Sequence, residues 1–298
     1  MPALFDLRLL DLRRLRAARI GTAGADFLFR RAAEDVLDRL SVVTRRFPVA
    51  VDLLSPLPVF PPGAPLPAGI GQVFRLDRLQ FAGGVVSSAI ADGEAIPLRD
   101  GSVDLVVSVL GLQTVNDLPG ALAQIRRALK PDGLFLAVLL GGDSLGELRA
   151  SIAAAEVEER SGASPRVAPF GGVRELGALL QRGQFGLPVA DADRVTVRYA
   201  DALALMRDLR AMGATNILVE RDGRPLTRAI VARTAAIYAE RFADPDGRIR
   251  ATFDLVSLSG WAPHQSQQKP LRPGSAQARL ADALNASEVG TGDKARPG

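Results

Sequence analysis

Apolar residues follow two different spacings along the chain, and their alternation predicts an α/β fold. Short, nearly continuous apolar runs are typical of parallel strands that are covered on both faces. Such runs predict strands at 49–54, 72–77, 85–91, 103–110 and 133–140, and later segments predict two more at 192–200 and 249–261. We therefore predict one mostly parallel sheet with the strand at 49–54 in its centre.

Apolar residues with helical spacing occupy the intervals between these runs. Two helices are predicted within the first 44 residues, and another begins after a capping Asn116 or Asp117 and ends at Pro131. Further helices are predicted at 141–160, 173–186, 200–212 and 225–242. Ser144 and Glu147 have the spacing of a capping box at the start of the first of these.

These elements divide the chain into three parts. Residues 1–44 are a helical N-terminal extension, and residues 45–262 are the α/β domain, with a helical insertion at about 200–245 before the last strand. Residues 263–298 are polar and rich in Gly, Ser, Ala and Pro, so we expect part of this tail to be disordered.

Composition removes several classes of chemistry. The chain has no cysteine and one histidine, His264, so thiolate zinc sites, cysteine nucleophiles and histidine clusters are excluded, and no metal site is predicted. A solitary histidine in a loop usually packs or is hydrated. The net charge of +4 is better explained by arginines spread over the surface than by a nucleic-acid-binding surface. No nucleic-acid partner is therefore expected.

The N-terminal segment is rich in arginine and amphipathic. No apolar run reaches the roughly 20 residues that a membrane span needs, and Asp6 and Asp11 argue against a mitochondrial transit peptide. We therefore expect a cytoplasmic protein. Four arginines of the first helix form either a solvated face or a docking face for an acidic partner or a peripheral membrane contact: Arg13, Arg14, Arg16 and Arg19.

Three acidic residues lie at the ends of successive predicted strands. Asp52 is at the end of the first strand, Asp77 ends the second, and Asp92 follows the third. The carboxyl ends of parallel strands meet at one edge of a sheet, where α/β proteins bind their ligands. A carboxylate at the second strand can accept hydrogen bonds from ribose hydroxyls. Each of these aspartates alone is equally compatible with a simple turn.

The segment "ADGEAIPLRDGSVDLVVSVLGLQTVNDLPGALAQIRRALKPDGLFLAVLLGGDSLGELR" resembles the core of class I S-adenosylmethionine-dependent methyltransferases. Three segments outside this core, "MRDLRAMGATN", "YAERFADPDGRIRATFDLVSLSGW" and "HQSQQKPLRPGSA", resemble one branch more specifically. That branch contains the mitochondrial complex I assembly factor that hydroxylates an arginine, with its bacterial relatives. Malonyl-carrier-protein methyltransferases of biotin synthesis share the core only.

The resemblance implies a Rossmann-like, seven-stranded class I methyltransferase sheet whose last strand is antiparallel, and a crevice for S-adenosylmethionine. It implies that Asp77 binds the ribose hydroxyls, that Asp92 binds the adenine amino group, and that Gly93 and Glu94 shape the loop beneath. The full set of predicted cofactor residues is Asp52, Leu53, Asp77, Arg78, Asp92, Gly93, Glu94 and Ser108.

Predicted substrate contacts lie in two segments. Gln113 and Asn116 belong to "VLGLQTVND", which would line the crevice where the methyl group is presented. Gly141, Gly142 and Asp143 belong to "GGDS", which either contacts substrate at the crevice rim or is only a glycine turn before a helix. The catalytic residue remains unassigned.

The chain departs from the family pattern after the first strand. The family has D-x-G-x-G-x-G there, because bare backbone must approach the methionine carboxylate. This chain has "DLLSPLP", and residues 55–69 contain six prolines. Pro56 and Pro58 also remove two N–H donors. Losing two or three such contacts, at roughly 1.5–3 kcal/mol each, would weaken a micromolar site to millimolar or worse. At Gln113 and Thr114 relatives carry bulkier side chains.

Three functions follow from these observations. The first is an S-adenosylmethionine-dependent, methyltransferase-like protein, by family an enzyme of the transferase type, that has a degenerate cofactor loop and is linked to complex I assembly. The degenerate loop predicts that its S-adenosylmethionine binds weakly or not at all. The second is an inactive assembly factor on a methyltransferase scaffold. The third is an arginine hydroxylase acting on a subunit of complex I, which would then be the partner.

Overall fold

The structure is a computed structural model that describes residues 3–21, 24–79, 87–160 and 162–267, together with Asp282 and Ala286. Residues 1–264 form one compact unit. From residue 268 onward the predicted polar tail lies almost entirely outside the described residues, and so do positions 85 and 86 of the predicted third strand.

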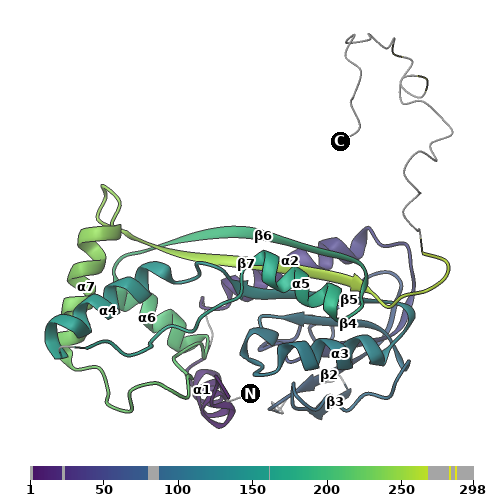
Figure 1. Cartoon of the computed structure of the whole chain (residues 1–298), viewed down its shortest axis with the longest axis horizontal. Helices are drawn as coiled ribbons and strands as arrows, with labels where there is room; N and C mark the ends of the chain where they lie inside the picture. Colours follow the sequence, from purple (N-terminus) through teal and green to yellow (C-terminus); the bar gives the residue numbers. More distant parts are fainter. Residues whose placement is uncertain are drawn as a thin grey trace, which may run out of the picture. The chain divides into compact units, whose positions relative to one another are not determined.

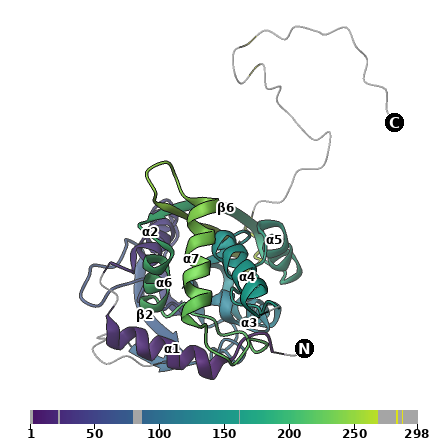
Figure 2. The same ribbon diagram turned by 90° about the vertical axis from the view of Figure 1, so that its left-hand side faces the viewer.

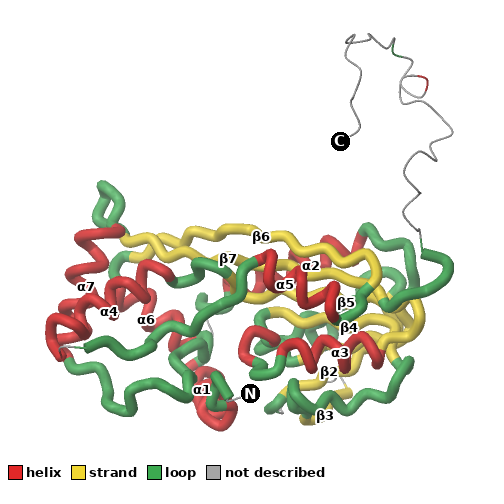
Figure 3. The backbone as a smooth tube through the Cα atoms, viewed as in Figure 1, coloured by secondary structure: helices red, strands yellow, loops and turns green. Residues whose placement is uncertain are grey.

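A seven-stranded sheet forms the centre of this unit, in the order β3-β2-β1-β4-β5-β7-β6 (Figures 1 and 3). The strands are β1 Phe47–Leu53, β2 Ile70–Asp77, β3 Ser87–Ile90, β4 Val103–Val109, β5 Leu129–Gly141, β6 Gly186–Tyr199 and β7 Ile249–Trp261. β1 to β5 pair in parallel, and β7 is antiparallel to both β5 and β6. The predicted fold class is confirmed. The central strand is β4, however, and β1 lies beside it.

The helices are α1 Leu7–Ile20, α2 Phe27–Ser41, α3 Leu118–Ala128, α4 Gly146–Arg160, α5 Val173–Arg182, α6 Ala202–Ala211 and α7 Arg228–Phe242, and Leu112–Thr114 is a 3-10 turn. The expected insertion before the last strand consists of α6 and α7, and α7 packs on α4 (Figure 1). The predicted capping box is wrong. Ser144 Oγ instead accepts from Asp254 N at 2.9 Å, and Glu147 binds Thr252.

Both faces of the sheet are buried. Ala50 of β1 packs in the core beneath α2, whereas the next residue, Val51, packs in the core beneath α3 and α5. Because consecutive side chains of a strand point to opposite faces, a strand covered on both sides is mostly apolar on both of its faces. This explains why the apolar runs predicted the strands of the sheet so closely.

The first helix runs along the edge of the sheet where its parallel strands end (Figure 2). Asp6 caps it by accepting from Leu9 N at 2.9 Å. Asn116 bonds both the N–H and the carbonyl of Phe5, at 2.7 and 3.2 Å, which ties the start of the helix to the loop after β4. Further along, Gly213 lies so close that a Cβ there would be 3.4 Å from Ala17 Cβ. The predicted N-terminal extension is therefore packed against the chain rather than projecting from it.

Gly111 begins the 3-10 turn in a position that has no room for a side chain. A Cβ at this residue would lie 2.3 Å from the carbonyl oxygen of Leu54. We expect Gly111→Ala to lower the free energy of unfolding by about 1–3 kcal/mol, the usual cost of overpacking. Urea denaturation tests this, with Gly146→Ala as the matched control, because a Cβ at Gly146 meets nothing within 4 Å. Equal stability of the two variants would contradict the expected contact.

Candidate cofactor crevice

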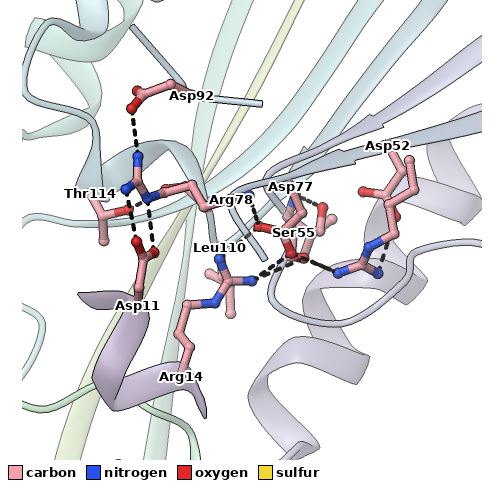
Figure 4. A network of polar contacts seen from close by, with 12 residues as sticks. Asp11, Arg14, Asp52, Ser55, Asp77, Arg78, Asp92, Leu110 and Thr114 are labelled. Atoms are coloured by element: carbon pink, nitrogen blue, oxygen red, sulfur yellow. Dashed lines mark hydrogen bonds and ion pairs between the residues drawn. The ribbon is translucent and has the colours of Figure 1, made fainter. Parts of the chain in front are cut away.

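The carboxylate of Asp77 is held by arginines of the same chain. Asp77 ends β2 and is 3% exposed. Arg14 of α1 donates to both of its oxygens, at 2.8 and 2.9 Å, and Arg75 Nη2 donates to Oδ2 at 3.0 Å (Figure 4). The oxygens that the resemblance assigns to ribose hydroxyls therefore already have cationic partners in this form of the protein.

Asp92 is engaged in the same way by a second arginine. Arg78 Nη1 donates to Asp92 Oδ2 at 2.6 Å, and its Nε and Nη2 donate to the carboxylate of Asp11, both at 2.9 Å (Figure 4). The hydrogen bonds that Arg78 donates to Asp11 raise the pKa of Arg78 above its usual value. Asp11 and Arg14 are three residues apart on α1 and so lie on the same face of that helix. One face of α1 thus connects to both predicted cofactor acids.

The loop after β1 is folded back onto Asp52. Asp52 is 2% exposed, and its Oδ2 accepts from Val59 N, within the proline-rich segment, at 2.9 Å. Ser55 Oγ accepts from Val109 N at 3.0 Å, and the Ser55 carbonyl accepts from Arg75 at 2.7 Å. Leu54 has a φ of 58°, in the left-handed region that the glycine of the family pattern would adopt freely. The proline-rich segment is therefore an ordered substitute for the glycine-rich turn.

Burial makes Asp52 sensitive to pH. Desolvation raises its pKa to about 6, against the opposing charge of Arg75, from a usual value of 3.8. A carboxyl with a raised pKa stabilises the fold while it is protonated, and this contribution is lost as the pH rises through about 6. The shift of about two units corresponds to about 3 kcal/mol.

We therefore expect the free energy of unfolding of the parent to fall relative to that of Asp52→Asn by about 3 kcal/mol between pH 4 and pH 7. Urea denaturation across this range measures the difference. Parallel pH profiles for the two proteins would show that Asp52 is not buried as described.

Two cavities adjoin these acids. The larger, of about 380 Å³, is lined by the proline-rich segment, by α1 and α2, and by Asp77. The smaller, of about 20 Å³, lies at Asp92, Gly93 and Glu94, and Leu54 and Arg78 also line it. Arg14 lines both cavities, so its side chain separates them. A Cβ at Gly93 would meet Leu54 Cδ1 at 2.8 Å, which shows how fully the adenine end is filled.

The other predicted cofactor residues are inaccessible or support the loops. Leu53 and Ser108 are fully buried, and Ser108 Oγ has no hydrogen-bond partner within the described ranges. Glu94 N donates to Asp92 Oδ1 at 2.9 Å, and the Glu94 carboxylate accepts from Asn116 N. That Leu53, Ser108 and Glu94 bind a cofactor stays a prediction.

The predicted substrate residues fall into two groups. Gln113 lines the 380 Å³ cavity, whereas the side chain of Asn116 is committed to the backbone of Phe5. The segment 141–143 lines neither cavity and is held against β7. A Cβ at Gly141 would meet Val256, one at Gly142 would meet Asp254, and Asp143 N donates to Asp254 Oδ2 at 3.0 Å. The segment is thus a turn held by β7, and the substrate role of Gly141, Gly142 and Asp143 stays a prediction.

The sequence did not indicate three residues that close the crevice: Asp11, Arg14 and Arg75. The sequence analysis uses Asp11 only as an argument against a transit peptide. It predicts a solvated or docking face for Arg14, and this is wrong, because the Arg14 guanidinium is directed inward to Asp77. A signal was present in the pattern, since Asp11 and Arg14 share a helical face with Leu7 and Leu10. This pattern does not indicate which residues Asp11 and Arg14 contact.

The crevice in this form does not fit an adenosine-type cofactor. Both acids that would bind ribose and adenine are paired with guanidinium groups, and the space beside Asp92 is too small for a base. In addition, Pro56 and Pro58 lack the N–H groups that a carboxylate would require. Within the described ranges we find no group of three or more potential metal-binding side chains and no helix long and apolar enough to cross a membrane.

Comparison with known proteins agrees with this architecture. The family described as "Methyltransferase domain" matches residues 74–137. Among solved structures, YcgJ of Bacillus subtilis has a TM-score of 0.52 at 12% identity, covering 79% of this chain and 99% of YcgJ, which shows the fold alone. Malonyl-[acyl-carrier protein] O-methyltransferase of Xylella fastidiosa (strain M23) is 40% identical over 172 residues, covering 58% of this chain and 56% of the relative.

Longer similarity exists to one set of relatives. "Arginine-hydroxylase NDUFAF5, mitochondrial" of Danio rerio is 36% identical over 278 residues, covering 86% of this chain and 82% of the relative. The human protein of the same name is 38% identical over 264 residues, covering 86% of this chain and 76% of the relative. The similarity exceeds 30% identity over more than two thirds of both chains, so the chain belongs to the NDUFAF5 family, a branch of the class I S-adenosylmethionine-dependent methyltransferases.

Proposed function

We propose that this methyltransferase-like protein acts in the assembly of a respiratory-chain NADH dehydrogenase (complex I), and that S-adenosylmethionine binds it weakly or not at all in the form described above. The observation that carries the proposal is the pairing of Asp77 with Arg14 and of Asp92 with Arg78. A cofactor would have to break both ion pairs to reach these acids. Kinship with the NDUFAF5 relatives supports the link to complex I.

A cell-based experiment tests the role separately from the cofactor. In a strain that lacks the gene, we expect lower NADH dehydrogenase activity of complex I, and the unmodified gene should restore it. We expect Asp92→Ala to restore it as well, because Arg78 keeps its two hydrogen bonds to Asp11. Unchanged activity in the deletion strain would overturn the assembly role. Failure of Asp92→Ala alone would instead favour the alternative in which cofactor binding is required.

A second candidate, arginine hydroxylation, rests on the names of the NDUFAF5 relatives. It differs from the first in its product, an additional oxygen on an arginine of a complex I subunit. Peptide mass spectrometry of complex I from the deletion and complemented strains distinguishes the two. A modified arginine that disappears with the gene supports hydroxylation, whereas identical peptide masses with impaired assembly support the scaffold role.

The compartment and partner belong to the same proposal. We propose a cytoplasmic protein that meets a complex I subunit there, whereas the NDUFAF5 relatives are named as mitochondrial. Peripheral contact with a membrane remains part of this proposal, because Leu12 and Ile20 of α1 are 57% and 55% exposed. Fractionation of cells into soluble and membrane-associated protein measures it.

A further inference from the structure

A third and larger cavity adjoins the crevice. It has a volume of about 820 Å³ and lies between α1, α4 and α6 and the segments 166–170 and 213–226. Much of its wall is apolar, including Leu148 and Ile152 of α4 and Phe253 of β7. Gln113 lines both this cavity and the 380 Å³ cavity, so the two are neighbours. The α1 and α6 helices that border it are seen together in Figure 2.

The charged residues of this cavity are almost all of one sign. Its lining includes a single acid, Asp222, and the following arginines: Arg13, Arg16, Arg166, Arg207, Arg210, Arg221 and Arg224. Three of these arginines are neutralised by ion pairs, because Arg166 binds Glu156, Arg221 binds Asp6, and Arg224 binds Asp222.

The guanidinium groups of the other four, Arg13 and Arg16 of α1 and Arg207 and Arg210 of α6, form no hydrogen bond or ion pair with any part of the chain that the structure describes. Arg13 is half-buried and the other three are exposed to solvent, which screens their mutual repulsion, and an anion placed among them would be attracted by all four charges. Two helices that are distant in sequence thus supply positive charge to the same cavity.

Buried polar atoms in the same wall also lack partners. Arg13 Nε, Thr215 Oγ1 and Gln113 Oε1 are inaccessible and make no hydrogen bond among the described residues. Buried polar groups in proteins are normally hydrogen-bonded, and an exception usually indicates a bound water, ion or ligand. These atoms belong to residues of the cavity wall and include both donors and an acceptor, which suits a polar head group rather than an apolar ligand alone.

We propose that this cavity binds an amphiphilic anion, a single apolar chain that ends in a carboxylate or phosphate-type head group. Guanidinium groups bind both head groups through paired hydrogen bonds. The apolar wall accommodates the chain, and the volume lies in the range of cavities that bind small molecules. A cationic group would meet charge of its own sign here and is therefore disfavoured. The proposal is independent of methyl transfer and of the assembly role.

Calorimetric titration of the full-length protein with four probes tests the proposal: oleate, oleoyl lysophosphatidate, oleyl alcohol and inorganic phosphate, each below its aggregation threshold. We expect oleate or lysophosphatidate to bind with one-to-one stoichiometry and at least about 10-fold more tightly than oleyl alcohol, a difference of about 1.4 kcal/mol. Phosphate without a chain should bind far more weakly. The tighter of the two anions identifies the head group.

Charge-removing variants make the test specific. The double variant Arg13→Gln, Arg210→Gln should weaken binding of the anionic probe by at least about 10-fold and leave oleyl alcohol unaffected. It should fold as well as the parent, since neither side chain has a carboxylate partner to lose within the described ranges. The matched control is Arg174→Gln, which replaces an exposed residue of α5 outside the cavity. It should leave the affinity for every probe unchanged.

Three results would each overturn the proposal. The first is that neither anionic probe binds the parent protein. The second is that oleyl alcohol binds as tightly as the anions. The third is that the double variant, with an unchanged urea midpoint, binds the anion as the parent does. Binding of an acidic peptide in place of both amphiphiles would also count against it.

Discussion

Replacing Arg14 by alanine is expected to increase the affinity of the protein for S-adenosylmethionine. The change removes the guanidinium that holds both oxygens of Asp77, and it joins the two cavities that the side chain separates. Arg75 still neutralises Asp77, so the fold should tolerate the change. If the ion pair opposes binding by about 1.5–3 kcal/mol, the dissociation constant should fall about 10-fold to 100-fold.

The matched control for this prediction is Arg19→Ala, which removes an exposed arginine from the last turn of the same helix. Calorimetry on both variants and the parent measures the effect. A further increase in affinity for S-adenosylmethionine is expected when glycine replaces Leu54, Pro56 and Pro58. These changes restore N–H donors and let the backbone approach the cofactor closely. If the Arg14→Ala and Arg19→Ala variants bind the cofactor with equal affinity, the ion pair between Arg14 and Asp77 does not limit cofactor binding.

Replacing Asp77 by alanine is expected to cost about 3–5 kcal/mol of stability, the usual effect of removing one partner of a buried ion pair. Asp77 is 3% exposed, and its loss leaves Arg14 and Arg75 without their carboxylate in a confined site. Such a change is a large part of the 5–15 kcal/mol that stabilises a typical domain. Urea denaturation provides the measurement.

Asp193→Ala is the comparison, because Asp193 pairs with Arg31 at a site where both side chains are more than half exposed. Such a pair contributes at most about 1 kcal/mol. In a double-mutant cycle, Asp77→Ala should cost less when Arg14 is already alanine. Equal costs for Asp77→Ala and Asp193→Ala would mean that Asp77 is free of partners, as a cofactor-binding carboxylate would be. The stability effect also makes Asp77→Ala a poor reporter of cofactor binding on its own.

The sequence predicted the sheet well because a strand covered on both faces is mostly apolar, without strict alternation of apolar and polar residues. This holds for β1, β4 and β7, whose predicted limits differ from the observed ones by at most two residues. β6 is the least accurate, since it begins at Gly186 rather than 192, and its long exposed face weakens the apolar signal. The capping box failed because Ser144 and Glu147 have partners on β7, a strand that lies about 100 residues away in sequence.

The site was less predictable for a related reason. Local pattern and family resemblance placed Asp52, Asp77 and Asp92 at the strand ends, and the structure has them there. Whether those acids are free depends on contacts between residues far apart in the chain, such as Arg14 with Asp77 across 63 positions. No spacing rule reports such a contact. The sequence pointed to Arg13 and Arg16 on α1 but not to Arg207 and Arg210 on α6, because only the fold brings these two helices together.

Titration of the unmodified protein with S-adenosylmethionine in a calorimeter measures directly whether the crevice is closed to the cofactor. We expect no measurable binding, or a dissociation constant in the millimolar range, because arginines of the chain itself hold the carboxylates of the crevice and prolines replace the glycines of its loop. A micromolar dissociation constant with one-to-one stoichiometry would contradict it and indicate a methyltransferase-type cofactor site that is open in solution.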